Sequence, residues 1–597
     1  MFMNLDSISI EEILLRRKAL RRELSAREGS QSIRVAVLGG TTANEVVDLL
    51  ELHLLASGFK PTFYISEYGQ YFEDAVHDPR LLIEFKPDIV YLHTSCLNVQ
   101  TFPPQHASQL EFDACLNAEM ARYRQIWQSL QNNLSCQIIQ NNFENPPYAI
   151  LGNMDVASMG GRSRFLHELN SAFARDISEQ PKLILQDIQG ISSRIGLNHW
   201  FDWQRWFSYK ILISPEGSLA VARSLCAVIG SIFGKSRKVL VLDLDNTLWG
   251  GVIGDDGVDK IQLGRETAVG EAYIAFQEYC LSLRNRGVLL AVCSKNNEET
   301  AKLGFEHPDS VLKLEHVSCF KANWEPKPDN ILAIAKELNL GADSFVFVDD
   351  NPAERAVVIA QIDGIAVPDV GDDVSKFASI IEAGRYFESV SLSDEDLARA
   401  SLYANNAKRA AFESTFADYG QYLDSLEMSA EIDLVKPVYV ERVAQLTNKT
   451  NQFNLTTRRY TVAEIQSIVA DHGYLAIYAK LSDRFGDNGL VSVVLGRKAQ
   501  GMLHLDLWLM SCRVLKRELE TALLDVLIAR ARSAGIQSLV GYYRPTKKNG
   551  MVAEHYRQLG FGLDAPPADD GSSTWRLDVE GYTPRNQHIK ILEPVDG

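Results

Sequence analysis

The sequence predicts an α/β protein that is built from several domains. Its 597 residues correspond to roughly three or four domains, and an apolar content of 46% is ample for full cores. In the first two thirds of the chain, short apolar runs that end in polar residues alternate with helix-like segments. This pattern is typical of parallel sheets covered by helices. The last third predicts a mixed α+β domain instead.

Composition excludes several classes of protein. A net charge of −17 argues against a general nucleic-acid binder. No stretch approaches the roughly 18 apolar residues that a membrane span needs, and the N-terminus lacks the pattern of a signal peptide. The eight cysteines are scattered, without a C-x-x-C pair or zinc spacing. We therefore expect a cytoplasmic protein with reduced thiols and with neither a membrane nor a nucleic-acid partner.

Residues 1–30 are expected to form one charged, amphipathic helix. Apolar positions such as Ile13 and Leu20 recur among Arg and Glu residues at helical spacing. This pattern fits a helix that packs against a domain edge or a partner, and it fits a solvated leader equally well.

Residues 31–225 are predicted to form a first α/β domain. Its first strand ends in Gly-Gly-Thr41-Thr42, where SGNH/GDSL hydrolases carry Gly-Asp-Ser. The catalytic serine is missing unless Thr41 or Thr42 replaces it, and the family's Asp-x-x-His is absent. We expect an SGNH-like fold without hydrolytic activity, in a docking or substrate-gating role. Fainter similarities to other blocks of that family are Gly152-Asn153 and His199-Trp-Phe-Asp202.

Residues 236–385 are predicted to form a second α/β domain around an acidic strand end. Four apolar residues, Val239 to Leu242, precede Asp243 and Asp245. Such a run marks a strand that is covered on both faces, and ligands bind at the carboxyl ends of these strands. Carboxylates there are costly to bury unless they are used. The pair therefore indicates divalent-cation binding and phosphoryl chemistry.

Three more polar positions follow in order along this domain. Ser294 ends the next apolar strand, Lys327 lies in Trp-Glu-Pro-Lys-Pro, and Asp349-Asp350 ends a third strand. The order Asp-x-Asp-x-Thr, Ser, Lys, Asp-Asp resembles the four motifs of the haloacid dehalogenase (HAD) superfamily.

The HAD resemblance implies a role for each motif residue. Asp243 is the expected nucleophile and Asp245 the general acid/base, while Ser294 and Lys327 hold the phosphoryl oxygens. The Thr247 hydroxyl is expected to orient Asp243. Thr247 and Asn296 are further expected binding residues. The expected cofactor is Mg²⁺, and its expected ligands are Asp243, the backbone carbonyl of Asp245, Asp349 and Asp350.

The spacing of the motifs argues against a large cap domain. About 50 residues separate Asp243 from Ser294, and about as many separate Ser294 from Asp349, which is room for little more than a crossover helix and a strand. The glycine-rich loop after Trp249 is expected to form only a flap. We therefore expect an open site that admits a bulky or macromolecular substrate.

The C-terminal third completes the predicted architecture. Residues 386–435 are expected to be a helical linker, 436–580 a domain, and 581–597 a tail. Within the domain, the helix-to-strand segment that starts at Ala553 resembles the GCN5-related acyltransferase (GNAT) fold. Lys516-Arg517 stands where a coenzyme A loop needs glycines, so acetyl-CoA chemistry is not expected.

The HAD-like and GNAT-like segments together resemble the FkbH-like family, whose members make glyceryl-acyl carrier protein. The resemblance covers 236–580, and longer members carry an SGNH-like extension. Members often show Gly-Arg where this chain has Lys516-Arg517. The matching strings include Leu242-Asp-Leu-Asp-Asn-Thr-Leu-Trp-Gly-Gly, Trp324-Glu-Pro-Lys-Pro-Asp-Asn, Val348-Asp-Asp-Asn-Pro-Ala-Glu and Asn451-Gln-Phe-Asn-Leu-Thr-Thr-Arg-Arg-Tyr.

This resemblance implies a reaction and a partner. The glyceryl unit of 1,3-bisphosphoglycerate would lose phosphate and pass to the phosphopantetheine thiol of an acyl carrier protein, for polyketide or tetronate biosynthesis. One alternative is a stand-alone HAD phosphatase that acts on a small phosphate ester. A second is a non-catalytic scaffold that recruits carrier proteins.

Two cysteines are candidates to hold the glyceryl group. Cys293 precedes Ser294, and a thiolate near magnesium and Lys327 would have a lowered pKa and attack an acyl phosphate. An ordinary buried cysteine is the alternative reading. Cys512, beside Arg513, is the competing thiol.

Carrier recognition needs positive charge on this acidic chain. Basic residues in the last third would speed the encounter with an acidic carrier, and scattered solvated charge is the alternative. The candidates are Arg458, Arg459, Lys516, Arg517, Lys547 and Lys548.

Overall fold

The computed structural model divides the chain into two compact units. One is formed mainly by Met3–Gly230, and the other by Ser231–Tyr460 and Ile465–Gly597. The structure describes residues 5, 8–26, 31–180, 182–413, 415–450, 452–546 and 548–592.

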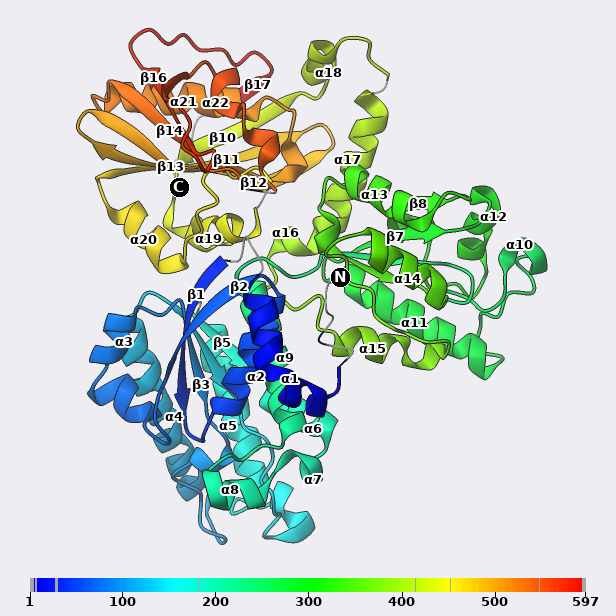
Figure 1. The fold of residues 1–597 in the computed structure, drawn as a ribbon, viewed down its shortest axis with the longest axis vertical. Coiled ribbons are helices and arrows are strands. Elements are labelled where there is room, and N and C mark those ends of the chain that lie inside the picture. The colour runs from blue at the N-terminus through cyan, green and yellow to red at the C-terminus, as the bar shows by residue number, and fades with distance from the viewer. Residues whose placement is uncertain are drawn as a thin grey trace. The chain divides into compact units, whose positions relative to one another are not determined.

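The first unit is built on a parallel five-stranded sheet with the order β2-β1-β3-β4-β5 (Figure 1). Its strands are β1 (Gln31–Gly39), β2 (Phe59–Ile65), β3 (Ile89–His93), β4 (Gln137–Asn141) and β5 (Leu183–Gln186). Its helices are α1 (Ile10–Ser25), α2 (Asn44–Ala56), α3 (Arg80–Phe85), α4 (Gln109–Asn133), α5 (Arg162–Ser178), α6 (Ile188–Ile195), α7 (Leu197–Trp200), α8 (Trp203–Tyr209) and α9 (Pro215–Ile232).

Helix α1 packs against α2. Its apolar positions Ile13 and Leu20 are fully buried, and Arg17 and Arg21 form ion pairs with Asp48 of α2. Of the two roles that its sequence pattern allows, the structure therefore shows the helix that packs at a domain edge.

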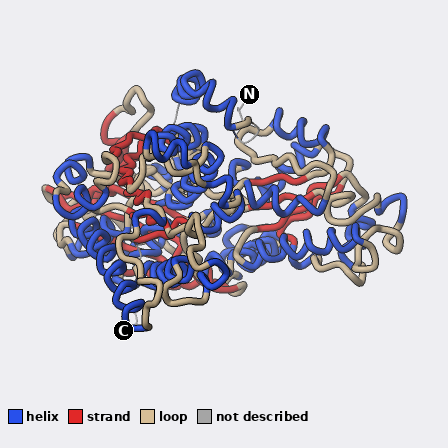
Figure 2. The backbone as a smooth tube through the Cα atoms, turned by 90° about the horizontal axis from the view of Figure 1, so that it is seen from below, coloured by secondary structure: helices blue, strands red, loops and turns tan. Residues whose placement is uncertain are grey.

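The second unit begins with a parallel four-stranded sheet with the order β8-β7-β6-β9. In Figure 2, the strands of this sheet, at the right of the view, lie between helices on both sides. Its strands are β6 (Val239–Leu242), β7 (Leu289–Ser294), β8 (Val317–Ala322) and β9 (Phe345–Val348). Its helices are α10 (Ile253–Asp256), α11 (Ala268–Asn285), α12 (Glu298–Leu303), α13 (Lys327–Glu337), α14 (Pro352–Gln361) and α15 (Phe377–Ala383).

Strand alternation places the two faces of β6 in different cores. Leu240 and Leu242 pack in the cluster that includes α11, while Val239 and Val241 pack in the cluster that includes α13. Both faces are therefore buried, as the continuous apolar run predicts. The residues that follow β6, β7 and β9 meet at one edge of the sheet.

Only a small flap covers the segment after β6. It contains the four-residue helix α10 and a bridge between Gly250 and Gln262. A Cβ atom on Gly250 would lie 2.9 Å from Cβ of Gln262, so this close approach requires glycine. Within 231–413, all of which the structure describes, no further domain is inserted between β6 and β9.

The rest of the second unit holds an eight-stranded mixed sheet with the order β15-β16-β14-β13-β12-β11-β10-β17. Its strands are β10 (Met428–Leu434), β11 (Tyr474–Asp483), β12 (Gly486–Ala499), β13 (Met502–Met510), β14 (Ser538–Tyr543), β15 (Gly562–Ala565), β16 (Ser573–Asp578) and β17 (Ile589–Leu592). The helices of this part are α16 (Asp394–Leu397), α17 (Arg399–Glu413), α18 (Tyr419–Ser425), α19 (Val440–Lys449), α20 (Val462–Ala470), α21 (Leu519–Ser533) and α22 (His555–Gln558). The predicted α/β multidomain class is thus confirmed.

Two strands of this sheet lie outside the domain range expected from the sequence. Strand β10 falls in the predicted linker 386–435, and β17 falls in the predicted tail 581–597. The two pair with each other in parallel. β10 directly follows a helical pattern, and β17 is only four residues long, so neither shows enough periodicity to be recognised alone.

Across the described ranges, no helix combines the length and the apolar character that crossing a membrane requires.

Candidate active site

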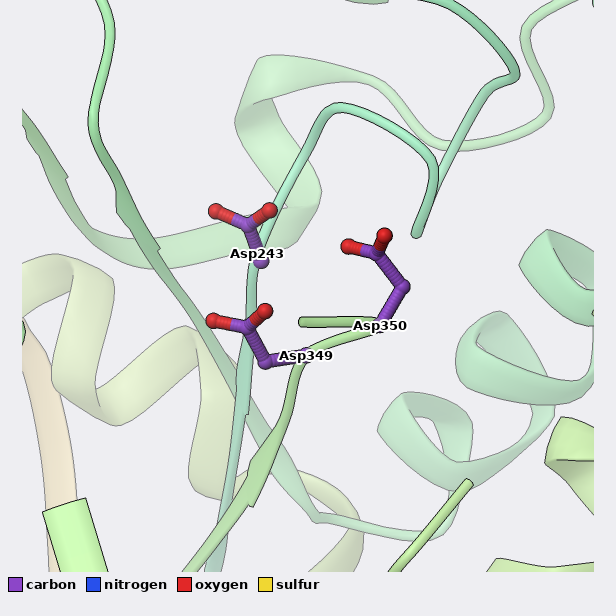
Figure 3. Close-up of side chains that lie close together, drawn as sticks. All are labelled: Asp243, Asp349 and Asp350. Carbon is purple, nitrogen blue, oxygen red and sulfur yellow. The ribbon is translucent and has the colours of Figure 1, made fainter. Parts of the chain in front are cut away.

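Three carboxylates converge at the carboxyl edge of the β6–β9 sheet. Asp243 follows β6, and Asp349 and Asp350 follow β9 (Figure 3). One oxygen from each lies within 4.8 Å of the others. Asp243 is only 6% exposed and Asp349 is fully buried. Asp350 is partly exposed, and a set of three carboxylates at this spacing fits a hard divalent cation such as magnesium.

Lys327 bridges two of these carboxylates. It is the first residue of α13, whose start places the ammonium group at the edge of the sheet. Its Nζ donates hydrogen bonds to Asp243, at 2.9 Å, and to Asp349. Because the side chain is only 4% exposed, these ion pairs compensate charges that would otherwise be unfavourable to bury.

Burial and the neighbouring charges shift the pKa values of Asp243, Asp350 and Lys327. Burial raises the pKa of Asp243 to about 7, an effect that the Lys327 ammonium opposes and that Asp349 reinforces. For Asp350, burial and then the Asp349 charge raise the pKa. Burial alone would lower the pKa of Lys327, but the two carboxylates outweigh it and raise this pKa. The lysine therefore stays charged, and its ammonium favours the ionised form of Asp243 against the effect of burial.

Asp245 lies at the base of the flap. Its carboxylate accepts hydrogen bonds from Trp249 Nε1 at 2.9 Å, from the Ile253 backbone N–H at 3.1 Å and from Asn296 Nδ2 at 3.0 Å. Burial raises the pKa of Asp245, which suits a group that donates a proton. Asn296, predicted as a binding residue, is thus held against Asp245.

Thr247 contacts a different carboxylate from the one expected. Its hydroxyl lies 3.4 Å from Asp350 Oδ1 and accepts the Asp350 backbone N–H at 3.3 Å. The chain turns at Asn246, whose φ is +55°, and this turn brings Thr247 towards the end of β9. The expectation that Thr247 orients Asp243 is therefore replaced by a contact that positions Asp350.

An open cavity of about 190 Å³ lies over these groups. Six predicted residues line it, and its rim adds four that sequence reasoning missed. Lys295 directly follows Ser294, so its position was visible in the sequence. Glu354 lies in a matching string, but only the start of α14 brings it to the cavity. The lining residues are Asp243, Asp245, Asn246, Ser294, Lys295, Lys327, Asp349, Asp350, Asn351 and Glu354.

Cys293 differs from the expectation of a reactive thiolate. Its side chain is fully buried in the apolar cluster between the sheet and α13, and its Sγ lies 3.7 Å from the Lys327 carbonyl. Burial raises the pKa of this thiol to about 12, despite the nearby Lys327 ammonium. Strand alternation turns Cys293 into the core, because the adjacent Ser294 faces the cavity. The structure therefore supports the alternative of an ordinary core cysteine.

Replacing Cys293 by Ala is expected to leave catalysis within about threefold of wild type, since the thiol does not reach the cavity. The lost packing should lower the free energy of unfolding by about 1 kcal/mol. The rate of glyceryl loading on the carrier, with phosphate release beside it, and urea denaturation measure the two effects. A hundredfold loss of glyceryl loading in a folded variant would restore the acyl-carrying role.

Cys512 lies far from the carboxylates. Its backbone carbonyl accepts a hydrogen bond from Asn339, just beyond the end of α13, and its side chain packs against the cluster that contains Val239. Helix α13 starts at Lys327 and has 11 residues, which places Cys512 about 16 Å away. Neither thiol is therefore positioned to take an acyl group at the cavity.

Two of the basic residues expected to dock a carrier are structural. Arg459 is largely buried and donates to the backbone carbonyls of Phe233, at 3.0 Å, and Asn448. Arg517 is buried and forms an ion pair with Asp483 at 2.9 Å. Burial lowers the pKa of both arginines to about 10. These two are therefore withdrawn as docking residues.

The remaining basic candidates lie on the surface or outside the described residues. Arg458 and Lys516 are exposed, and Arg458 lies over the Tyr460 ring at 5.2 Å from its centroid. Lys548 is exposed but forms an ion pair with Asp343. Lys547 lies outside the residues that the structure describes. Arg458 and Lys516 thus remain the candidates for contact with an acidic partner.

The SGNH-like positions of the first unit have local structural contacts. The Thr42 hydroxyl donates to the Tyr209 carbonyl at 2.9 Å. Asp202 caps α8 by accepting the Arg205 backbone N–H at 3.0 Å. Thr41 is buried, and His199 is exposed on α7. Gly152 and Asn153 begin a short 3₁₀ helix, Gly152–Val156.

Comparison with solved structures identifies a similar protein at substantial identity. The N-terminal part of the protein BF1531 from Bacteroides fragilis, which contains a phosphatase domain and is complexed with Mg, is 31% identical. The alignment covers 63% of this chain and 99% of that chain, with a TM-score of 0.58.

Two further solved structures are similar at low identity. The ribosomal-protein-S18-alanine N-acetyltransferase from Escherichia coli is 14% identical over 26% of this chain and 99% of its own, with a TM-score of 0.21. A putative GNAT-family acetyltransferase from Desulfovibrio desulfuricans is 18% identical over 26% of this chain and 99% of its own, with a TM-score of 0.20. No function follows from these two. No family model and no curated protein matches the chain.

Proposed function

The chain belongs to the HAD-like family of BF1531, and from this premise and the geometry of its site we propose that it is a magnesium-dependent phosphatase. The observation that carries the proposal is the cluster of Asp243, Asp349 and Asp350, the first two of them buried, with Lys327 between these two. Such a cluster offers a nucleophile, a set of metal ligands and a fixed positive charge within one small cavity.

Each residue has a place in the proposed reaction. Asp243 attacks phosphorus, and a bond to its carboxylate oxygen forms while the bond to the leaving oxygen breaks. Asp245 donates a proton to that leaving oxygen, then accepts one from the water that hydrolyses the aspartyl phosphate. Lys327 and Ser294 hold the phosphoryl oxygens. Magnesium, when bound by Asp243, Asp349 and Asp350, adds positive charge where the transition state is most negative.

We further propose that the dephosphorylated product is a glyceryl group loaded on an acyl carrier protein. The strings shared with the FkbH-like family support this step, as does a small flap that leaves the cavity open to a large partner. Trp324, three residues before Lys327, is 76% exposed, and exposed aromatic residues are frequent anchors of protein interfaces.

The positions of the cysteines favour direct transfer to the carrier. Because Cys293 is buried and Cys512 is distant, the phosphopantetheine thiol itself would attack the acyl carbon of 1,3-bisphosphoglycerate. A carbon–sulfur bond forms, the carbon–oxygen bond to phosphate breaks, and the thiol proton passes to solvent. Asp243 then removes the phosphate at the other end of the three-carbon unit.

Intact mass spectrometry of the carrier tests both steps together. The protein is incubated with magnesium, 1,3-bisphosphoglycerate and phosphopantetheinylated carrier, and free phosphate is measured in parallel. A glyceryl mass gain on the carrier supports the transfer. Phosphate release with an unchanged carrier indicates the stand-alone phosphatase. If neither occurs while the carrier binds, the protein is the non-catalytic scaffold.

A further inference from the structure

A second lysine lies at the rim of the cavity, in an ion pair of its own. Lys295 follows Ser294 at the end of β7, and Glu354 lies in the first turn of α14. Lys295 Nζ and Glu354 Oε1 are 2.7 Å apart, with side chains 41% and 19% exposed. Both residues line the cavity.

Lys295 differs from Lys327, the other lysine of the cavity, in its ion pairs and in its exposure to solvent. The described lining residues include five carboxylates and two lysines. Lys327 is buried and forms ion pairs with both Asp243 and Asp349, which keep its ammonium group at the place of the transferring phosphoryl group. Lys295 is bound by one carboxylate and is partly exposed to solvent. An ion pair of this kind is weak, because water screens it, and it exchanges partners readily.

We propose that Lys295 leaves Glu354 to bind a second anionic group of the substrate, one that lies outside the phosphoryl group that is removed. This inference rests on the proposed phosphatase function and names its substrate class: phosphate compounds whose leaving group carries a carboxylate or another phosphate. Lys327 and the metal site serve the transferring group, and Lys295 serves the rest of the molecule. Glu354 holds the lysine at the rim and competes with the substrate for it.

Three matched ligands that share a three-carbon frame test the assignment. Glycerol 3-phosphate has an uncharged remainder, 3-phosphoglycerate adds a carboxylate, and 2,3-bisphosphoglycerate adds a further phosphate. Binding to the magnesium-loaded full chain is measured by calorimetry, and phosphate release is measured separately. The variants are Lys295→Met, Lys295→Arg and Glu354→Gln.

Lys295→Met is expected to weaken binding of 3-phosphoglycerate and 2,3-bisphosphoglycerate about tenfold, the range of one charged hydrogen bond, and to change binding of glycerol 3-phosphate less than threefold. Glu354→Gln should strengthen binding of the two ligands that have more than one anionic group, and Lys295→Arg should keep the preference for them. Comparison of 3-phosphoglycerate with 2,3-bisphosphoglycerate shows whether a second phosphate adds to the effect of the carboxylate.

The outcomes separate this inference from the proposed function. If Lys295→Met weakens all three ligands equally, or none, the inference is overturned even where phosphate is released. If binding depends on Lys295 as expected but the wild type releases no phosphate from any ligand, the inference stands and the phosphatase proposal fails.

Discussion

Asp243→Asn is expected to lower phosphate release by at least about 10³-fold while the protein stays folded. An amide is not a nucleophile towards phosphorus and also removes one negative ligand from the metal site. The substitution is nearly isosteric, and Lys327 keeps its ion pair with Asp349. Initial rates of phosphate release at saturating magnesium, together with the thermal unfolding midpoint, measure activity and folding.

Asp373→Asn is a matched control for this variant. Asp373 belongs to the same domain, is exposed, and forms an ion pair with Lys376 at 3.0 Å, and neither residue lines the cavity. It undergoes the same change of charge and should retain nearly full activity. If Asp243→Asn keeps more than about a tenth of the wild-type rate, Asp243 is not the nucleophile, and Asp245 becomes the next carboxylate to examine.

The strands that position the site were predictable for a physical reason. The apolar runs before Asp243 and Asp349 are buried on both faces, so each had to be a strand of a covered parallel sheet. The polar residues after such strands meet at one edge, and this rule alone brought Ser294 to the same cavity.

Side-chain direction was harder to predict than strand position. Cys293 lies next to Ser294 in sequence, yet strand alternation and a fully apolar surrounding put its thiol in the core. Arg459 and Arg517 look like surface charges in the sequence, but backbone carbonyls and Asp483 hold them inside. Such partners are distant in sequence, and charge patterns do not reveal them.

The ion pair between Lys295 and Glu354 at the rim of the cavity was also not predictable from a local sequence pattern. Lys295 meets Glu354 only because α14 begins within four residues of the end of β9, and the two residues are 59 positions apart. The pairing of β10 with β17 likewise joins the two ends of the last domain. Both contacts depend on the assembled fold and not on any local pattern.

Lys327→Met is expected to lower the free energy of unfolding by about 3–5 kcal/mol in the absence of divalent cations. The substitution leaves Asp243 and Asp349 close together in a buried position without their shared cation. Their mutual repulsion then raises the energy of the ionised folded state, because little water reaches them. Phosphate release should fall by about 10²-fold or more, since the transferring group loses a fixed positive charge.

Magnesium should restore much of the stability of this variant but not its activity. A divalent cation bound by the same carboxylates replaces the missing charge in the folded state only, and this stabilises the fold by mass action. Urea denaturation with chelator and with magnesium measures the difference for the wild type and for Lys327→Met.

Lys321→Met is the control for Lys327→Met. It measures how much stability is lost when a lysine outside the site is removed from the same domain. Lys321 of β8 pairs with Glu337 at 2.8 Å, but its side chain is partly exposed, so its removal should change stability by less than about 1 kcal/mol with or without magnesium. Equal destabilisation by the two variants, or a Lys327→Met loss that magnesium does not reduce, would show that the carboxylates are not held together by Lys327. In that case Asp243 and Asp349 would need another source of positive charge, and Lys327 would no longer be assigned to the transferring phosphoryl group.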